Sequence, residues 1–265
     1  MRKQNSTVAF PVSIEINMLP TPSTSHISFF NTIYEPAEDS FLLLDTLSNQ
    51  TESAWLKDRF PQQTSSPLVT EIGTGSGVVI AFLAANARAI LGREDVLALG
   101  VDVNADACMA TKVTVQNALA EQKAPTLYLG SLCSDLANSF NSNSVDILIF
   151  NPPYVPSDVL PALPQIAGPG RCRFDAESHL LSLSYAGGKK GMETTNRLLN
   201  DMPRILSARG VAYVMFCARN EPEEVKARIE WEWGGRWSVE TVGKSGKTAG
   251  WEKLEILRIW RSNGA

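Results

Sequence analysis

The strongest indication of the fold is the segment PLVTEIGTGSGVVIAFLAANARAI, residues Pro67–Ile90. It begins with a short apolar run, passes through three glycines at alternate positions, and continues as a long apolar segment. This order is typical of a strand, a tight turn and a helix that packs on the same sheet. Glycine permits positive φ angles and lets a ligand come close to the backbone. The stretch therefore predicts a strand–turn–helix unit with a ligand at the turn, although a turn required only for helix–strand packing gives the same pattern.

The glycine spacing indicates which ligand fits. A dinucleotide-binding turn requires G-x-G-x-x-G or a final alanine, whereas the glycines from Gly73 through Gly75 to Gly77 follow G-x-G-x-G, and the sixth position holds Val78. An acid, Glu71, stands two residues before the first glycine. A carboxylate at that place opposes a pyrophosphate on the helix N-terminus. It favours a ligand with a cationic amine and a sulfonium, such as S-adenosylmethionine.

The rest of the chain repeats the alternation of strands and helices. Predicted strands lie in LVTEI, DVLALGVD, TLYLGSL, VDILIF, GVAYVMFCA, RWSVETVGKS and WEKLEILRIWR, and one helix is predicted over YEPAEDSFLLLDTLSNQ. The last two strands have no helix between them, so we expect a hairpin in which one strand is antiparallel. The pattern predicts an α/β fold with a mostly parallel, doubly wound seven-stranded sheet. We expect this domain to cover residues 31–265, after a flexible arm over residues 1–30.

Acidic residues follow the second and third predicted strands. Asp102 ends the second strand at the sheet edge that carries the glycine turn, where a carboxylate can accept both hydroxyls of a ribose. Asp102 could instead cap the next helix, and Asn104 could also serve as that cap. Asp135 follows the third strand and could accept a hydrogen bond from an adenine amine, with Leu136 against the ring. An ordinary loop or cap acid at Asp135 is an equal alternative.

A second unusual turn ends the fourth predicted strand, in VDILIFNPPYVPSD, Val145–Asp158. Proline has no N–H for a strand ladder and forces the preceding residue out of the helical region. Asn151 and Pro152 are therefore held extended, and the chain leaves the sheet in a stiff turn. Such turns at the carboxyl ends of strands are where open α/β sheets bind ligands, although an ordinary strand terminator is the plainer interpretation.

Composition sets limits on the function. The chain has 265 residues, 44% of them hydrophobic, and a net charge of -4, which argues against a broad nucleic-acid surface. Its four cysteines, Cys108, Cys133, Cys172 and Cys217, form no CxxC pair, and the two histidines lack neighbouring ligands, so we expect no metal and reduced thiols. Without an apolar run of about 18 residues we expect no membrane span.

Taken together, these segments resemble the class I S-adenosylmethionine-dependent methyltransferases, and more narrowly the HemK-type glutamine methyltransferases of translation release factors. The most specific match is YEPAEDSFLLLD, Tyr34–Asp45, which is similar to the opening motif of the eukaryotic and archaeal branch. EIGTGSGVV, NPPYV, AGGKKG and AGWEKLEILR match further family blocks in the same order. The resemblance covers the chain from about residue 31 to its end. The predicted sheet then corresponds to a class I methyltransferase Rossmann-like fold.

The resemblance implies roles for matching residues. Cofactor-binding positions carried over from the family are Ser40, where the family usually has threonine, Glu71, Gly73, Gly75, Asp102, Asp135, Leu136 and Asn151. The catalytic positions are Asn151, Pro152 and Tyr154. The Asn151 side-chain oxygen and the Pro152 carbonyl would accept hydrogen bonds from a glutamine amide, and the Tyr154 ring would pack against that amide. The substrate positions are Asn151, Pro153 and Tyr154. The segment Val155–Tyr185 is predicted as a loop, longer than the family leads us to expect.

The third predicted strand indicates where a partner chain could bind. In a doubly wound methyltransferase sheet it forms an edge, and Thr126–Leu132 is apolar with no lysine or proline to blunt it. Either the N-terminal arm or a loop covers this edge, or another chain adds to it. The resemblance implies a small zinc-binding activator subunit, and hence a heterodimer. A class I release factor is the implied protein substrate.

Three other functions stay open at this point. An adenine-N6 methyltransferase on DNA or RNA would use the same Asn-Pro-Pro-Tyr turn but needs a basic cleft for a flipped base. A protein lysine is another conceivable acceptor, and a non-catalytic binding module on the same fold is the third. The intact acids and Asn151 argue against the module. We expect a cytoplasmic protein, with the nucleus as a second location, and no direct nucleic-acid or membrane partner.

Overall fold

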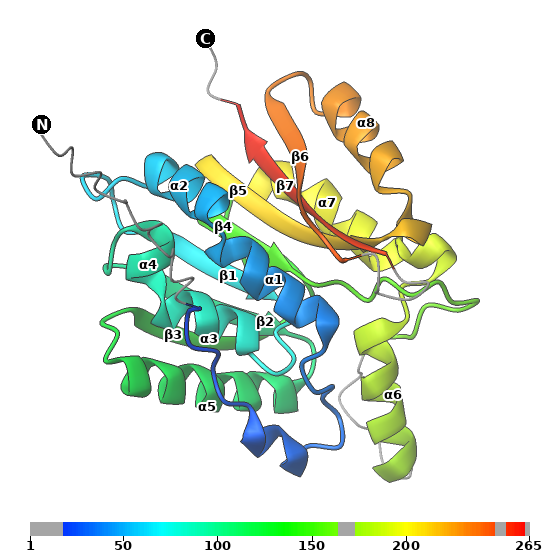
Figure 1. Cartoon of the computed structure of the whole chain (residues 1–265). Helices are drawn as coiled ribbons and strands as arrows, with labels where there is room; N and C mark the ends of the chain where they lie inside the picture. The colour runs from blue at the N-terminus through cyan, green and yellow to red at the C-terminus, as the bar shows by residue number, and fades with distance from the viewer. Residues whose placement is uncertain (1–17, 164–172, 247–252, 263–265) are drawn as a thin grey trace, which may run out of the picture.

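The computed structural model describes residues 18–163, 173–246 and 253–262 (Figure 1). Residues 1–17 of the predicted arm, Cys172, and residues 249–252 of the AGWEKLEILR block lie outside the described residues. Across the described part of the chain, no helix is both long enough and apolar enough to cross a membrane.

A seven-stranded sheet with the order β3-β2-β1-β4-β5-β7-β6 forms the centre of the molecule. The strands are β1 Leu68–Ile72, β2 Leu97–Asp102, β3 Leu127–Cys133, β4 Val145–Phe150, β5 Leu206–Cys217, β6 Trp237–Lys244 and β7 Leu254–Arg261. The first five run parallel, and β7 runs antiparallel to both β5 and β6. The predicted doubly wound sheet, its closing hairpin and its single antiparallel strand are confirmed.

Helices cover both faces of the sheet (Figure 1). One face carries α1 Glu38–Ser48, α2 Gln50–Arg59, α3 Val78–Ala85, α4 Ala87–Leu91 and α5 Ala105–Gln122. The other face carries α7 Glu193–Ile205 and α8 Pro222–Glu232, whereas α6 Arg173–Tyr185 stands apart from both layers. Short 3-10 turns lie at η1 Ser25–Phe29, η2 Lys189–Gly191 and η3 Ala218–Asn220. Apolar side chains from alternate strand positions fill two cores, one on each face.

The sheet places three strand ends together. β1 pairs with β2 on one side and β4 on the other, and Ile72 at its end is in register with Val101 and Phe150. Every residue of β4 is buried, so the Asn-Pro-Pro-Tyr turn starts from the rigid centre of the molecule. The strand order reverses between β1 and β4, and at such a point the adjacent loops separate and leave a crevice.

Two predictions for the helices were wrong. The helix expected over residues 34–50 ends at Ser48, and a second helix, α2, follows it. Asn49 makes the break, because its extended backbone ends α1 and its side chain accepts the N–H of Glu52 at 2.8 Å to cap α2. The long loop expected over residues 155–185 contains α6 in its second half.

The described end of the predicted arm packs on the domain. Ile27 is only 2% exposed and contacts Ala107 and Ala110 of α5. The carbonyl of Pro20 accepts a hydrogen bond from the Asn86 side chain at 3.3 Å. Residues 18–30 therefore pack near the end of α3 and on α5, on the face of the sheet that carries α1 to α5. The domain boundary at residue 31 stays a prediction.

Candidate active site

A cavity of about 560 Å³ opens at the carboxyl ends of β1, β2 and β4. This is the size of a small-molecule site, at the place where open α/β sheets bind ligands. Ten of the predicted site residues line it: Ser40, Glu71, Gly73, Gly75, Asp102, Asp135, Leu136, Asn151, Pro153 and Tyr154. Pro152 is buried and does not line the cavity, so the acceptor role of its carbonyl stays a prediction.

The glycine turn exposes backbone to this cavity. Gly73, Gly75 and Gly77 have φ angles of 68°, 48° and 74°, in the left-handed region that favours glycine. A β carbon at Gly75 would meet nothing within 4 Å, whereas one at Gly77 would lie 2.6 Å from the Thr111 backbone of α5. Both explanations of the turn therefore hold, at different positions. Gly77 lets α3 pack close to α5, and Gly75 leaves room for a ligand.

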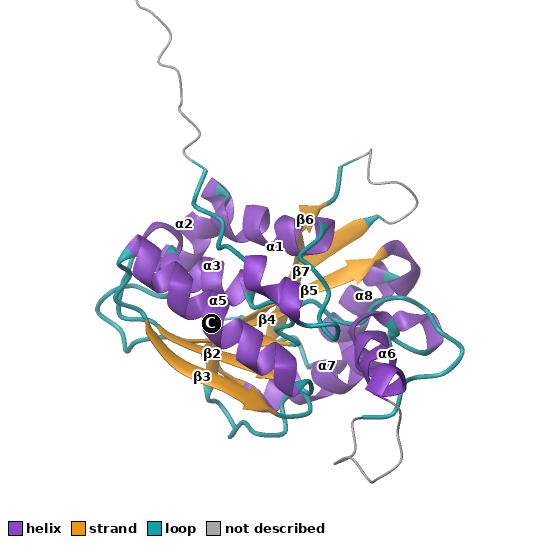
Figure 2. Cartoon of the chain, turned by 90° about the horizontal axis from the view of Figure 1, so that it is seen from below, coloured by secondary structure: helices purple, strands orange, loops and turns teal. Residues whose placement is uncertain are grey.

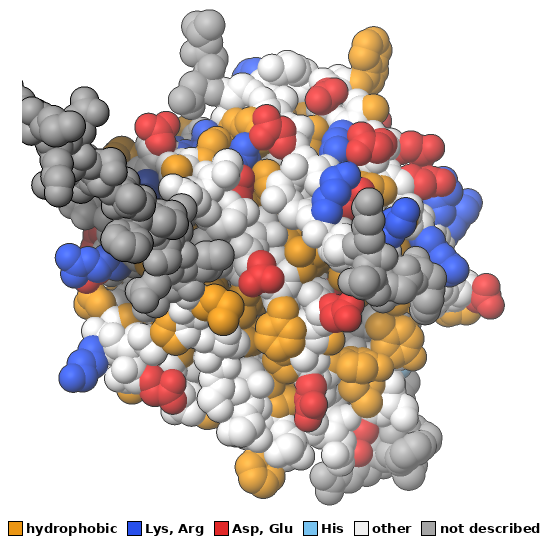
Figure 3. Space-filling model, in the orientation of Figure 1, with side chains coloured by type: hydrophobic (Ala, Val, Ile, Leu, Met, Phe, Trp, Pro, Cys, Tyr) orange, Lys and Arg blue, Asp and Glu red, His pale blue; other side chains and the backbone are white. Residues whose placement is uncertain are grey.

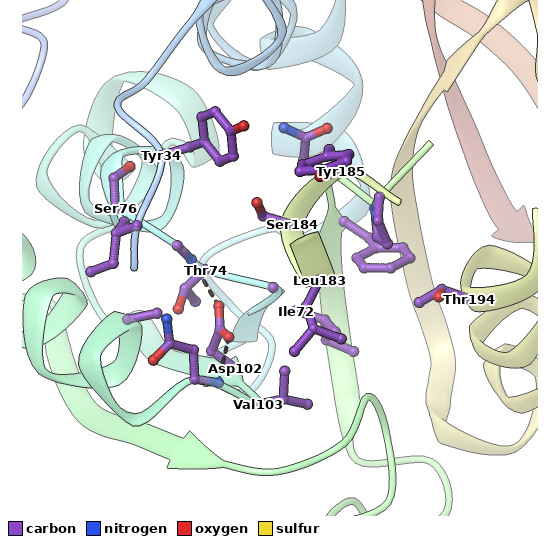
Figure 4. A pocket seen from close by; sticks show the side chains of 18 of the residues that line it. Tyr34, Ile72, Thr74, Ser76, Asp102, Val103, Leu183, Ser184, Tyr185 and Thr194 are labelled. Atoms are coloured by element: carbon purple, nitrogen blue, oxygen red, sulfur yellow. Dashed lines mark hydrogen bonds between the residues drawn. The ribbon is translucent and has the colours of Figure 1, made fainter. Parts of the chain in front are cut away.

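Asp102 does not cap a helix. Its two carboxylate oxygens accept backbone N–H groups from Gly75 at 2.9 Å and Asn104 at 2.8 Å (Figure 4). Asn104 is the cap of α5, since its side chain accepts the N–H of Asp106 at 3.0 Å. Burial raises the pKa of Asp102, and the backbone N–H groups partly offset that rise. Asp102 thus ties the glycine turn to the end of β2 and presents a carboxylate to the cavity.

Glu71 is the most buried acid of the cavity lining. It is 2% exposed, and one of its oxygens accepts the N–H of Ile80 in α3 at 2.9 Å. Burial raises its pKa from the ordinary 4.5 to about 8, the Ile80 N–H works against this rise, and Asp102 adds to it. A buried carboxyl that carries a proton at neutral pH becomes a carboxylate once a cation is placed beside it. Glu71 is suited to a cationic amine.

We expect cofactor binding to release a proton near pH 7 through Glu71. The free protein holds that proton below pH 8, and a bound ammonium lowers the pKa. Calorimetry in two buffers of different ionisation enthalpy measures the release, which should disappear in Glu71→Gln. The same shift makes ligand-free stability fall as pH rises from 4.5 to about 8, because the folded state binds a proton that the unfolded state has lost. Wild-type binding without proton release contradicts this role.

Asp135 and Leu136 follow β3 and line the cavity, as predicted. Asp135 forms an ion pair with Arg197 of α7, which also lines the cavity. A hydrogen bond from Asp135 to an adenine amine must therefore coexist with this pair, and it stays a prediction. Leu136 has a φ of 48°, an uncommon conformation for a branched residue. It is 8% exposed and packs into the core below the cavity.

The Asn151 side chain is held by an acid that we did not predict. Its Nδ2 donates to Asp39 Oδ2 of α1 at 2.8 Å. Its Oδ1 is buried and has no hydrogen-bond partner in the described part of the chain. A buried acceptor without a partner is costly and needs a reason. Asn151 lines the cavity, so a molecule bound there could donate a hydrogen bond to this oxygen.

The AGGKKG block, Ala186–Gly191, packs tightly against the backbone of the Asn-Pro-Pro-Tyr turn. A β carbon at Gly187 or Gly191 would overlap the carbonyl oxygens of Pro153 and Tyr154 respectively. Val155 pairs with Ala186 in a short parallel bridge. Buried Asn220 completes the clamp, with its Nδ2 donating to the Tyr154 carbonyl at 2.9 Å and to the Lys190 carbonyl at 2.8 Å. Two segments distant in sequence, the AGGKKG block and the one that carries Asn220, thus fix the turn.

Helix α6 forms one side of the cavity opening. This was not predicted, because the segment was expected to be a loop. Leu183, Ser184 and Tyr185 line the cavity, and the Tyr185 ring stands edge-on to that of Tyr34 at 6.2 Å between centroids. Figure 4 shows these two tyrosines at the end of the site away from Asp102. The three-residue spacing of Leu180 and Leu183 in AESHLLSLSY was a helical signal that could have revealed α6.

The strand order is that of the class I methyltransferase fold. No family model matches it. It is 35% identical over 247 residues to the eRF1 methyltransferase catalytic subunit mtq2 of Schizosaccharomyces pombe, covering 92% of this chain and 96% of that protein. It is 33% identical over 250 residues to the human methyltransferase HEMK2, covering 91% and 97%. The chain belongs to the HemK family of methyltransferases, in the predicted eukaryotic and archaeal branch.

A solved structure supports the same fold. The Mtq2–Trm112 complex of E. cuniculi, described as responsible for methylation of the eRF1 translation termination factor, matches with a TM-score of 0.52 and 22% identity. The match covers 87% of this chain and 99% of that one.

Replacing Asp102 with alanine should weaken cofactor binding more than it slows methyl transfer at saturating cofactor. Two hydrogen bonds from ribose hydroxyls to a charged acceptor contribute about 1.5–3 kcal/mol each, so we expect Kd to rise at least about tenfold. Titration calorimetry measures the Kd. Asp201→Ala, which removes a partly exposed carboxylate of α7 that does not line the cavity, is the control and should leave the Kd unchanged. Equal Kd values for Asp102→Ala and the wild type would show that Asp102 only braces the turn.

Proposed function

We propose that this chain transfers a methyl group from S-adenosylmethionine to the side-chain amide nitrogen of a glutamine in a class I translation release factor. The observation that carries the proposal is the Asn151 amide, which lines the cavity with an unpartnered, buried oxygen. The names of the relatives give further support, because they describe methylation of eRF1. The cytoplasmic location, with the nucleus as a second one, remains part of the proposal.

The described residues suit this cofactor. Glu71 offers a carboxyl to a cationic amine, Asp102 offers a carboxylate to ribose hydroxyls, and Gly75 leaves space over the backbone. When bound, S-adenosylmethionine supplies an electrophilic methyl group on its sulfonium. No group of three or more His, Cys, Asp or Glu side chains in the described residues is arranged to hold a metal ion.

The chemistry explains why an asparagine stands at this turn. A glutamine amide is a weak nucleophile, because its nitrogen lone pair is delocalised into the carbonyl. Acceptors around its two N–H bonds favour a pyramidal nitrogen and stabilise the positive charge that develops on it. Asn151 Oδ1 is one such acceptor, and the Pro152 carbonyl is the proposed second. Tyr154 lines the cavity and offers an aromatic face to the flat amide.

The charge of the cavity favours a protein substrate over a nucleic acid. Its lining contains six acids, Glu35, Glu38, Asp39, Glu71, Asp102 and Asp135, and one base, Arg197. A flipped adenine brings phosphates with it, and these need Lys or Arg. The mouth is instead apolar, with Tyr34, Leu163 and Tyr185 partly exposed. Apolar side chains also gather on the face between α1 and α6 (Figure 3).

Transfer of labelled methyl groups tests the proposed function. The enzyme, co-expressed with its partner subunit, is incubated with labelled cofactor and with the class I release factor, duplex DNA or a structured RNA in separate reactions. We expect label on the release factor alone, mapped by mass spectrometry to one glutamine side chain, and none after that glutamine is replaced by alanine. Label on adenine or on a lysine would replace the proposal with the corresponding alternative.

We also propose that the edge strand β3 binds a small zinc-binding activator subunit, as the resemblance implies. β3 lies at the margin of the sheet (Figure 2), and its Leu127, Leu129 and Leu132 are 58%, 50% and 39% exposed. In the described part of the N-terminal arm, Ile27 packs on Ala107 and Ala110 of α5. The three leucines of β3 stay exposed. A solved relative with this fold is a Mtq2–Trm112 complex. An apolar edge of this kind suits strand addition by another chain.

A lysine at Leu129 should break this heterodimer. The change places a charge on the edge, which natural sheets use to prevent pairing. Co-purification and size-exclusion chromatography measure complex formation. The chain expressed alone should be poorly soluble and weakly active, and co-expression should restore both properties unless Leu129→Lys is present. Trp231→Lys on α8, which removes an apolar side chain that is 87% exposed, is the matched control. A soluble, fully active monomer would remove the reason for this partner.

A further inference from the structure

The Asn151 side chain can be placed in two ways, and only one serves the proposed reaction. A rotation of its terminal amide exchanges the oxygen acceptor for the NH₂ donor. With the oxygen free, the site can accept an N–H from a glutamine amide. With the NH₂ group free, it would confront that substrate with a second donor.

Asp39 distinguishes these two states. An ionised carboxylate only accepts hydrogen bonds. The contact from Asn151 Nδ2 to Asp39 Oδ2 at 2.8 Å is therefore favourable with the NH₂ group toward Asp39, and it would become a repulsion between two oxygens after rotation. The unpartnered Oδ1 of Asn151 is the consequence, because the other half of the amide is already committed.

Asp39 is itself fixed. It lies in the first turn of α1, and its second oxygen, Oδ1, accepts the backbone N–H of Ser40 at 2.6 Å and approaches the Ser40 hydroxyl at 3.4 Å. A carboxylate near a helix N-terminus is also favoured by the helix dipole. Asp39 is thus anchored through one oxygen and directs Asn151 through the other.

We infer that Asp39 is a positioning residue that keeps the Asn151 oxygen available to the substrate; the inference rests on the proposed function. This role also accounts for the EDS part of the opening motif, Glu38–Ser40. The Asp39 carboxylate of this motif accepts a hydrogen bond from Asn151, which lies 112 positions further along the chain.

Asp39→Asn tests this inference with minimal change of shape. The new side chain has one oxygen instead of two. When the Ser40 N–H stays bonded to that oxygen, the NH₂ group of the new asparagine faces Asn151. The Asn151 amide then rotates to accept from this NH₂ group, and its oxygen no longer serves the substrate. We expect kcat to fall by about 10²-fold, with the cofactor Kd and the melting temperature unchanged. Asp45→Asn, an exposed position on the same helix, is the matched control and should retain wild-type kcat.

A reversed pair separates positioning from simple packing. In the double variant Asp39→Asn with Asn151→Asp, the amide donates to the carboxylate, whose second oxygen again faces the substrate. We expect this variant to recover at least about tenfold of the kcat lost in Asp39→Asn. In an Asn151→Ala background, Asp39→Asn should cause no further loss, since the group it orients is gone. Wild-type kcat in Asp39→Asn, or losses that multiply in the Asn151→Ala background, would overturn the inference.

A measurement without substrate keeps this test apart from that of the proposed function. The side-chain amide protons of Asn151, assigned by their absence in Asn151→Ala, should resonate at low field in the wild type because of the bond to a carboxylate. They should lose that shift in Asp39→Asn and keep it in Asp45→Asn. An unchanged resonance in Asp39→Asn overturns the inference. Failure of the wild type to methylate a release factor overturns the proposed function alone.

Discussion

Replacing Asn151 with alanine should lower kcat by about 10²–10³-fold and leave measurable cofactor binding. Loss of one preorganised acceptor at the reacting group typically costs this much in rate. The side chain has no second structural task that would unfold the domain, because its one hydrogen bond in the described residues goes to Asp39. Single-turnover methyl transfer to the release factor, together with titration calorimetry for the cofactor, separates the two effects.

Two outcomes decide this prediction. An Asn151→Ala enzyme with near wild-type turnover would remove the acceptor mechanism. Complete loss of cofactor binding would instead make Asn151 part of the cofactor site alone. Asn141→Ala, an exposed asparagine between β3 and β4, is the matched control and should leave both quantities unchanged.

Replacing Gly187 with alanine should lower kcat by about 10²-fold without changing any residue that touches the substrate. The added β carbon would overlap the Pro153 carbonyl and the Gly191 carbonyl, which are backbone atoms and cannot rotate away. The turn must shift, and a displacement of about 1 Å at a reacting group can cost about 10²-fold in rate. Rates at saturating cofactor measure the effect.

The glycine prediction has a control within the chain. A β carbon at Gly235, in the loop before β6, would meet nothing within 4 Å, and this position is far from the turn in the sheet order. Gly235→Ala should therefore retain wild-type kcat, apart from a small loss of stability due to its φ of 69°. Wild-type kcat in Gly187→Ala would show that the clamp does not set the geometry of the turn.

Local chemistry explains what could be read correctly from the sequence. The three glycines after LVTEI require positive φ angles, and the two prolines after Asn151 exclude a further strand, so both turns were predictable at their positions. The parallel sheet followed from strands that alternate with helices, and the hairpin from the missing helix before WEKLEILRIWR. Nine of the predicted site residues line one cavity because the carboxyl ends of neighbouring parallel strands meet at one edge, and Ser40 of α1 joins them there.

Hydrogen-bond partners explain what could not be read. Nothing local in EDS indicates that Asp39 reaches Asn151, and nothing near Asn220 indicates that it holds the Tyr154 carbonyl 66 positions earlier. The loop interpretation of residues 155–185 failed because glycines and prolines at its centre outweighed the helical spacing of its end.

Backbone sterics and hydrophobic periodicity act over a few residues, so the strands, the two turns and most of the residues that line the cavity could be predicted from the sequence. The direction of the Asn151 amide, the N–H partners of Asp102 and the segments that hold the Asn-Pro-Pro-Tyr turn could be identified only in the folded chain. These properties depend on distances of about 3 Å between groups far apart in the chain, and the packing of two helical layers on one sheet sets such distances.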